Sequence, residues 1–362
     1  MKRVLRFLFI GAGFFLLLVL LVVVVYFIIM ALTEYNPRAV LKAEVYGHGR
    51  GHPTLTDEFS FLTWNIGYAG LGKEMDFFYD GGKQVIPEKK LSEGYLEGIK
   101  KEIHNFDTLD FLYIQEIDIK SRRAYDVNEL DELAGELPQF YYVFGMNYNS
   151  WFVPVPLYQP MGSVKSGIST FSRHNPESVV MVPFGTHYPW PQRLVQLKRC
   201  FLMMKILLES GKELVVINTH NSAYDSTGEL RKNELQVLSR YMLNEYEKGN
   251  YVVTGGDWNS NPEGFRPQSI VSGDSIIRLD VPVSSSFFPG WHFAFDTLQP
   301  SNRFTNEPYK TGKTKTTIID FFVVSPNIEI LSVETKRMGF KYSDHEPVIM
   351  KIKLKKNGKA EL

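Results

Sequence analysis

The sequence contains almost no cysteine and carries no net charge. Its one cysteine, Cys200, excludes an intrachain disulfide and any metal site of the Cys-x-x-Cys type. Basic and acidic residues number 40 each, so no global positive field gathers nucleic acid around the protein. No internal repeat is evident. Hydrophobic residues make up 44% of the 362 positions, which is enough for a large packed core in one layered α/β domain.

The N-terminal segment is the clearest single feature. Residues 1–6 carry three basic side chains, and residues 7–32 are uncharged and apolar. As a helix these 26 residues would span about 39 Å, more than the roughly 30 Å of a bilayer core. A cleaved signal peptide is the alternative, but its apolar region is normally about 7–15 residues long and ends in a small-x-small site. We therefore expect a retained single-pass transmembrane helix at 7–32.

The charge flanking this helix predicts its orientation. Basic residues precede the span and a large domain follows it, so residues 1–6 are expected in the cytoplasm and the catalytic domain outside it. Residues 33–57 lack sustained periodicity and are interpreted as a tether with room for one added strand. The catalytic domain is expected at 58–356, followed by a polar tail at 357–362.

Beyond the tether, short apolar strands alternate with loops and a few helices. Several strands are apolar at successive positions, which indicates burial on both faces. The strongest helix is 226–247, with a capping box formed by Ser226 and Glu229, and a second is expected at 92–105. This pattern favours an α/β fold with two sheets packed face to face and helices outside. The expected strands are 59–67, 109–117, 141–148, 166–174, 200–207, 213–220, 251–259, 316–325 and 347–355.

Polar side chains gather where these strands end, which is where layered folds place their chemistry. A hard divalent cation prefers oxygen ligands such as carboxylates, and histidines paired with aspartates can act as general acid and base. The polar residues at or near strand ends are Asn65, Glu116, Asn218, His220, Asp257, Asn259, Asp344 and His345, with Asp320 inside a strand.

Each of these residues also has an ordinary structural explanation. Asn65 could cap a turn, Glu116 could pair with Lys120, and His220 could be a satisfied, half-buried histidine. The sequence GDWN at 256–259 is rich in turn formers. Asp320 is harder to explain in this way, because it is flanked by isoleucines and phenylalanines and an unpaired buried charge is very costly.

Taken in order, the motifs WNIG, QE, NTH, GDWN, ID and SDH resemble the endonuclease/exonuclease/phosphatase superfamily. DNase I, apurinic endonucleases, bacterial sphingomyelinases and inositol polyphosphate 5-phosphatases are members. The resemblance covers residues 59–355. It implies a four-layer α/β/β/α sandwich of the DNase I type, which agrees with the strand pattern.

The resemblance also implies a role for each motif residue. Asn65 and Glu116 would bind a catalytic Mg²⁺, with Mn²⁺ or another divalent cation as a substitute. His345 would be the general base, oriented by Asp344. His220 would bind or protonate the phosphate region, with Asp320 buried behind it.

The remaining motif residues would position phosphate and the nucleophile. This group contains Asp257, Asn259 and Asn218, with Ser169 and Arg173 matching a weaker element of the family. The physical logic is in-line attack on phosphorus, in which the metal neutralises developing charge.

Two departures from the family's motifs narrow the choice among its branches. Apurinic endonucleases carry an acid two residues after the first asparagine, where this chain has Gly67, so a second metal site is an open question. Thr219 and His220 begin THNSAYD, which is similar to the THxQAxD of sphingomyelinases, although Ser222 replaces the glutamine.

Three functions are compared. The favoured one is a membrane-anchored phosphodiesterase or phosphatase that acts on phospholipid headgroups or small phosphoesters. The aromatic stretch 284–295 could then enter the lipid interface or be ordinary core, and the loop 151–162 could wall the pocket. An extracellular nuclease is the alternative, with basic residues at 310–315 contacting the phosphate backbone. A non-catalytic binding module ranks last, and the sequence indicates no particular protein partner.

Overall fold

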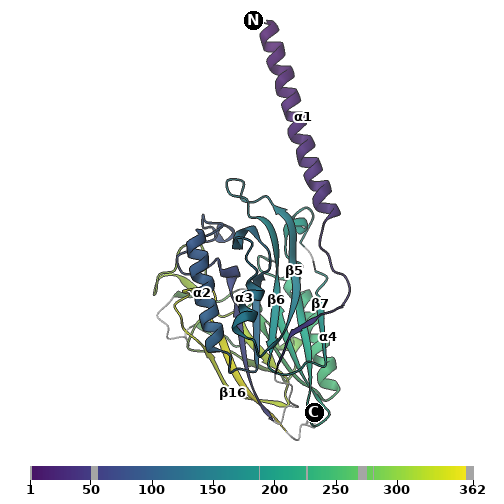
Figure 1. Cartoon of the computed structure of the whole chain (residues 1–362), viewed down its shortest axis with the longest axis vertical. Coiled ribbons are helices and arrows are strands. Elements are labelled where there is room, and N and C mark those ends of the chain that lie inside the picture. The colour runs from purple at the N-terminus through teal and green to yellow at the C-terminus, as the bar shows by residue number, and fades with distance from the viewer. Residues whose placement is uncertain are drawn as a thin grey trace.

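Two seven-stranded sheets packed face to face form the centre of the protein in a computed structural model (Figure 1). The structure describes residues 2–49, 56–186, 188–225, 227–267, 275–279 and 281–355. The first sheet has the order β1 (Leu41–Lys42), β7 (Ser178–Pro183), β8 (Cys200–Leu207), β9 (Glu213–His220), β10 (Tyr251–Asp257), β15 (Asp320–Val324) and β12 (His292–Ala294). The second has the order β16 (Ile328–Thr335), β17 (Val348–Leu354), β3 (Glu58–Asn65), β4 (Phe111–Asp118), β6 (Gly162–Ser172), β5 (Tyr141–Val153) and β2 (Val45–Gly47).

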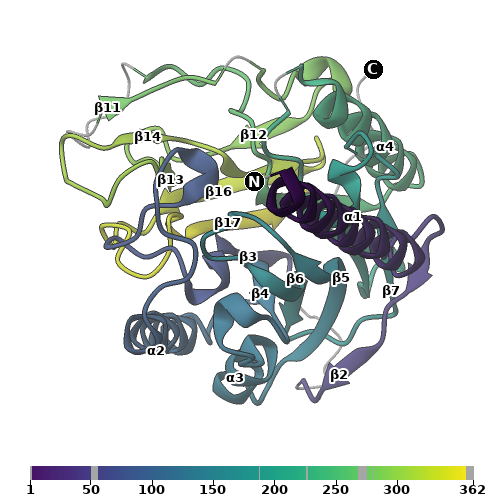
Figure 2. The same ribbon diagram turned by 90° about the horizontal axis from the view of Figure 1, so that it is seen from above.

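Helices cover the outer face of each sheet (Figure 2). α2 (Lys89–Asn105) and α3 (Glu129–Glu136) lie on the second sheet, and α4 (Glu229–Glu247) lies on the first. In α2 the buried residues Leu96, Ile99 and Ile103 recur at helical spacing, and this stripe packs on the apolar outer face of β3 and β4. The expected four-layer α/β/β/α sandwich is confirmed.

A separate apolar core fills the space between the sheets. Phe61 and Phe111 stack with their ring centroids 5.0 Å apart, and Phe322 from the other sheet meets Phe61 edge to face at 6.2 Å. Because the strands are covered on both faces, their sequences are continuous apolar runs.

Some elements differ from the sequence-based expectation. The expected strand 316–325 is two strands, because β14 (Lys315–Thr317) pairs in a small third sheet with β11 (Ser275–Ile276) and β13 (Asn302–Arg303). The aromatic stretch 284–295 does not form an exposed lipid-facing surface. Phe288 and Trp291 are buried against the first sheet and α4.

The N-terminal segment is the helix α1 (Lys2–Leu32), which projects away from the domain in Figure 1. It is long and apolar enough to cross a membrane, a property that a signal sequence would share. The segment expected as a tether carries two short strands instead of one. β1 pairs with β7 and β2 pairs with β5, so this segment adds one strand to the edge of each sheet. The polar tail and the predicted cap residue Ser226 lie outside the described residues, and α4 begins at Glu229 after Gly228.

Candidate active site

Strand pairing brings the motif residues to one end of the sandwich. β3 and β4 are parallel, which places Asn65 opposite Gln115 and beside Glu116. β9 and β10 are also parallel, with His220 opposite Asp257, and antiparallel pairing of β10 with β15 places Asp320 opposite Asp257. Residues separated by more than 200 positions therefore meet because their strands end at the same level.

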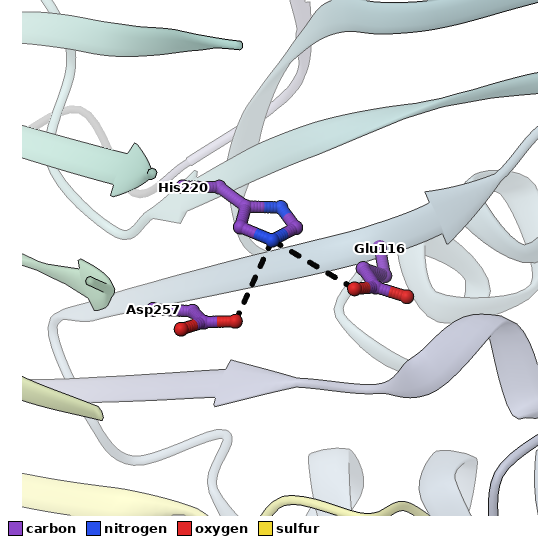
Figure 3. A group of neighbouring side chains, drawn as sticks. All are labelled: Glu116, His220 and Asp257. Carbon is purple, nitrogen blue, oxygen red and sulfur yellow. Dashed lines mark ion pairs between the residues drawn. The ribbon is translucent and has the colours of Figure 1, made fainter. Parts of the chain in front are cut away.

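A bulge in β4 directs Glu116 toward this cluster. The register between β4 and β6 shifts between Gln115 and Ile117, and Glu116 has a φ of 52°. A bulge of this kind re-aims a side chain that regular alternation would send elsewhere. The Glu116 carboxylate lies 3.7 Å from His220 Nε2, and the Asp257 carboxylate lies 3.5 Å from the same atom (Figure 3).

His345 is held by Asp320. Its Nδ1 lies 2.8 Å from Asp320 Oδ2, and its Nε2 lies 3.0 Å from the side-chain amide nitrogen of Asn302. The Nδ1 contact fits an imidazole that donates to the carboxylate, which both the neutral and the charged ring can do. The expectation that Asp344 orients His345, and that Asp320 lies behind His220, is wrong. Both Asp344 and His345 line the pocket, but the Asp344 carboxylate accepts from the Ser343 hydroxyl, whereas Asp320 holds His345.

Asn65 connects the acidic side chains of the two sheets. Its Nδ2 donates to Glu116 Oε1 at 3.2 Å and to Asp257 Oδ2 at 3.0 Å, while its Oδ1 accepts from the Gly67 N–H at 3.0 Å. Both N–H groups of the buried amide and one lone pair of its oxygen are thus occupied. Its direct ligation of a metal stays a prediction that would use the second lone pair of Oδ1.

His220 and Arg199 form a second polar pair beside the carboxylates. The Arg199 guanidinium hydrogen bonds to His220 Nε2, and Arg199 Nε is buried without a partner in the described part of the chain. Burial lowers the pKa of His220 well below its usual 6.5, and the charges of Arg199 and His345 lower it further. His220 is therefore neutral at physiological pH.

The site concentrates negative charge. Burial raises the pKa of Asp257 and of Asp344 to about 6 each, and nearby carboxylates add to both shifts. Burial lowers the pKa of His345, but Asp320 and Asp344 outweigh it and leave that pKa well above 6.5. A bound cation would relieve this accumulation of carboxylates.

The donor set fits a divalent metal. Glu116, His220 and Asp257 each offer a ligand atom, and these atoms lie within 4.8 Å of one another. Asp257, Asp320 and His345 form a second such group, although Asp320 and His345 already bond to each other. A site rich in carboxylates suits a hard cation such as Mg²⁺ or Mn²⁺.

Glu116, Asp257, Asp344 and His345 line a pocket of about 450 Å³, and His220 and Asp320 lie directly behind them. Its walls carry the aromatic residues Tyr68, Tyr79, Tyr148 and Tyr224. Four arginines also line it. Arg123, Arg231 and Arg303 bond to carboxylates or backbone carbonyls, whereas the hydrogen bond of Arg199 goes to His220.

Arg173, Asn218 and Ser169 lie outside the cluster and outside the pocket. Arg173 is at the opposite end of β6, where it donates to the Thr108 carbonyl oxygen at 3.0 Å. Asn218 is buried between the sheets and accepts from Gln115 Nε2 at 2.7 Å, and Ser169 donates to the Val143 carbonyl oxygen. Both side chains are satisfied within the core, so none of the three contacts the phosphate site. Asn259, by contrast, lines the pocket and donates to the Asn221 carbonyl oxygen.

Sequence reasoning missed Arg199 and Asn302. Arg199 directly precedes β8 in the stretch LKRC, and a basic residue at the start of an apolar strand is an ordinary feature. Asn302 belongs to the two-residue strand β13, which no periodicity reveals. A strand-end position was the only available signal for either residue.

A fold of two packed sheets with a carboxylate and histidine cluster at their common end defines a phosphoester hydrolase. The sequence pattern of the Endonuclease/Exonuclease/phosphatase family matches residues 62–345, and the chain belongs to that family. No curated protein matches the chain.

Solved structures share the fold at low sequence identity. An endonuclease/exonuclease/phosphatase from Beutenbergia cavernae DSM 12333 is 16% identical with a TM-score of 0.52, covering 82% of this chain and 72% of its own. The human Nocturnin catalytic domain with bound sulfate is 14% identical with a TM-score of 0.53, covering 86% and 97%. ANGEL2, a 2',3'-cyclic phosphatase, is 15% identical with a TM-score of 0.54, covering 88% and 100%.

Proposed function

We propose that the protein is a membrane-anchored, divalent-metal-dependent phosphodiesterase or phosphatase that acts outside the cytoplasm on phospholipid headgroups or small phosphoesters. The observation that carries this proposal is the pairing of His345 with Asp320, set beside the carboxylates of Glu116 and Asp257 in one pocket. This arrangement places a general base next to a cation site.

The residues of the chain divide the chemistry among them. His345 Nε2 takes the proton of the attacking water, and Asp320 fixes the imidazole and stabilises its charged form. The side-chain amide nitrogen of Asn302 lies beside this atom, 3.0 Å from the same Nε2. Arg199 faces the phosphate oxygens and donates to charge that develops on them, while neutral His220 accepts from Arg199 at Nε2 and orients its guanidinium.

Glu116 would hold the metal, with Asp257 and Asp344 completing its surroundings and Asn65 fixing the carboxylates. When bound, the metal supplies charge neutralisation at the scissile phosphate. Gly67 lies beside Asp344, where a Cβ would approach Asp344 Oδ1 to 3.0 Å. A side chain at position 67 would therefore crowd the carboxylate cluster.

The residues that directly follow α1 are tied to the domain. Glu34, two residues after the helix, pairs with Lys198 at 2.9 Å and with Arg193 at 3.4 Å. The Tyr35 hydroxyl donates to the Met146 carbonyl oxygen at 2.9 Å. Within α1 itself, Tyr26 bonds to Phe152 and Phe27 packs near Trp190, and these contacts support a helix that stays attached.

A nuclease is the second candidate. Tyr79 and Tyr224 lie in the pocket wall with their ring centroids 5.6 Å apart, and such aromatic side chains can stack on nucleic-acid bases. The basic cluster 310–315 gives this candidate less support, because it does not line the pocket and Lys310 pairs with Glu307.

A substrate panel tests both candidates with the full-length protein in liposomes. The substrates are sphingomyelin, phosphoinositides, plasmid DNA, RNA and a soluble bis-aryl phosphodiester, each with Mg²⁺ and with EDTA. We expect Mg²⁺-dependent cleavage of the lipids and of the bis-aryl compound. Cleavage of no phosphoester under any divalent metal would refute the enzymatic proposal, and DNA cleavage well above lipid cleavage would favour the nuclease.

A further inference from the structure

The length of α1 and the position of the basic residues before it indicate where the membrane surface lies relative to the domain. About 20 helical residues cross a hydrocarbon core of roughly 30 Å. Counted from Phe7, directly after the last basic residue of the N-terminus, such a span ends at Tyr26. The last turns of α1, from Phe27 to Leu32, then lie in the lipid interface next to the domain.

Two loops of the domain touch α1 at this level. The Tyr26 hydroxyl donates to the Phe152 carbonyl oxygen at 3.2 Å, and the ring of Phe27 lies 5.7 Å from that of Trp190. Phe152 belongs to the end of β5, before the loop that leads into β6. Trp190 lies just before the short helix η4 (Gln192–Val195). Met30, which faces the domain, is only 1% exposed.

The end of β5, the loop after it and the segment before η4 expose large apolar side chains. We define the rim as Trp151, Leu157, Tyr158 and Trp190, whose exposed fractions are 61%, 87%, 70% and 64%. Single exposed hydrophobic residues are ordinary. Here Trp190 contacts Phe27 of α1, and Trp151 precedes Phe152, which accepts from Tyr26. Leu157 and Tyr158 lie in the loop that follows β5. The other three tryptophans of the chain are buried. Tryptophan and tyrosine are the residues that membrane interfaces favour.

The rim and the pocket share their supporting segments. Asn147 and Tyr148 of β5 line the pocket, as do Gln196 and Leu197 directly after η4. The loop between β5 and β6 also lies at the end of the second sheet where β4 reaches Asp118, since Asp118 pairs with Ser166. Figure 1 shows that loop and the base of α1 at the same end of the domain.

We infer that the rim lies in the interface of the bilayer that α1 spans, so that the pocket receives phosphate headgroups of lipids from that bilayer. This inference rests on the proposed function and names its substrate class. The rim holds the domain against the lipid surface, and α1 keeps it at that height. Soluble phosphoesters still reach the pocket, because the rim does not line it.

A depth measurement on the full-length protein in liposomes tests the location of the rim without relying on activity. Leu157→Cys is labelled with an environment-sensitive bimane, and lipids brominated along their acyl chains serve as quenchers. The native Cys200 does not interfere, because it is buried, which raises the pKa of its thiol to about 12. Leu207→Cys is the matched control, since Leu207 is 54% exposed at the far end of β8.

We expect quenching and a blue-shifted emission at position 157 and neither at position 207. Equal exposure to water at both positions would overturn the inference. Quenching at both would indicate that the whole domain lies on lipid without using the rim, and would also overturn it. Native tryptophan fluorescence provides a second measurement. The fraction of this fluorescence that brominated lipids quench should be smaller in Trp190→Phe than in the wild type.

A rate comparison tests the consequence for the substrate. Leu157→Asp and Trp190→Asp are expected to slow hydrolysis of bilayer lipid on the order of tenfold. The same variants should hydrolyse the soluble bis-aryl phosphodiester at the wild-type rate, and Leu207→Asp should change neither reaction. If the rim variants hydrolyse bilayer lipid at the wild-type rate, the inference is refuted. If the wild-type protein does not hydrolyse the soluble phosphodiester, the proposed function is refuted instead.

Discussion

His345, in the loop before β17, is paired with Asp320 at the start of β15: the imidazole Nδ1 lies 2.8 Å from the Asp320 carboxylate. Asp320 is fully buried at the start of β15, and its other carboxylate oxygen has no hydrogen-bond partner among the described residues. A buried carboxylate with a single histidine partner fixes one tautomer of that histidine. Removing either residue should therefore disable the same step.

The first prediction concerns this pair. We expect Asp320→Asn and His345→Ala each to lower kcat by at least about 100-fold, because a positioned base is lost in both. The double variant should fall no further than the lower single variant, since the two residues act as a unit. Steady-state hydrolysis of the bis-aryl phosphodiester measures this. Asp131→Asn, on α3 and remote from the pocket, should retain normal activity.

The second prediction separates Asp344 from His345. If Asp344 belongs with the metal-binding carboxylates, Asp344→Asn should need more Mg²⁺ yet recover much of its rate at high Mg²⁺. Asp320→Asn should recover at no Mg²⁺ concentration. Rate measurements across a Mg²⁺ titration distinguish the two. If high Mg²⁺ does not restore the rate of Asp344→Asn, Asp344 would instead be the residue that orients the general base His345.

Glu116→Gln gives a third prediction. Replacing this carboxylate removes a charged ligand, so kcat should drop at least about 100-fold at ordinary Mg²⁺. Calorimetric titration of Mg²⁺ should show weakened binding, which is a readout independent of turnover. EDTA should abolish wild-type activity and added Mg²⁺ should restore it. Unchanged Mg²⁺ binding in Glu116→Gln would show that Glu116 is not a metal ligand. Glu97→Gln, at an exposed position, is the control.

The fourth prediction contrasts two arginines. Arg199→Ala should lower kcat/KM by roughly 10- to 100-fold, which corresponds to the roughly 1.5–3 kcal/mol of a hydrogen bond to a charged group. Inhibition by inorganic phosphate should weaken in parallel. Arg173→Ala should behave as wild type, because Arg173 lies at the other end of β6. Phosphate inhibition that persists unchanged in Arg199→Ala would contradict the assignment.

The fifth prediction concerns stability at the far end of the sandwich. Asp110 accepts hydrogen bonds from Ser60 N–H at 2.8 Å and from the Ser60 hydroxyl at 2.7 Å, and it lies 2.9 Å from His174 Nε2. Burial raises the pKa of Asp110, but the hydrogen bonds from His174 and Ser60 outweigh it and leave the pKa below 3.8.

The folded state thus binds this proton more weakly than the unfolded chain does. The contribution of Asp110 to stability is full above pH 3.8 and is lost as pH falls through its lower folded pKa. Asp110→Asn should cost about 1.5–3 kcal/mol at neutral pH, and the gap from wild type should close in acid. Urea unfolding at several pH values measures the difference in unfolding free energy between the two proteins. A difference that grows in acid would contradict the predicted direction.

Local pattern was sufficient for the strands that are apolar throughout. β8 and β9 begin and end at the residues that their apolar runs predict, because charged or glycine-containing turns bound them. β16 was missed because it is an edge strand with many exposed positions, and its sequence IEILSVET alternates poorly. α3 was missed because eight residues give only two helical turns.

The site was predictable as a set of residues and not as a set of contacts. Motif order identified Glu116, His220 and His345, but the bulge that turns Glu116 arises only when β4 pairs with β6. In the same way, the choice of Asp320 over Asp344 depends on how β15 lies beside the loop before β17, which no local pattern encodes.

The two short strands after α1 have a consequence for handling the protein. β1 and β2 are the outermost strands of the two sheets, so they cover backbone groups of β7 and β5 that would otherwise be free. Unpaired strand edges are templates for association between chains. A shortened protein that begins at residue 57 would expose both edges, and one that begins at residue 33 would keep them covered. Trimming only the helix therefore protects the domain against aggregation.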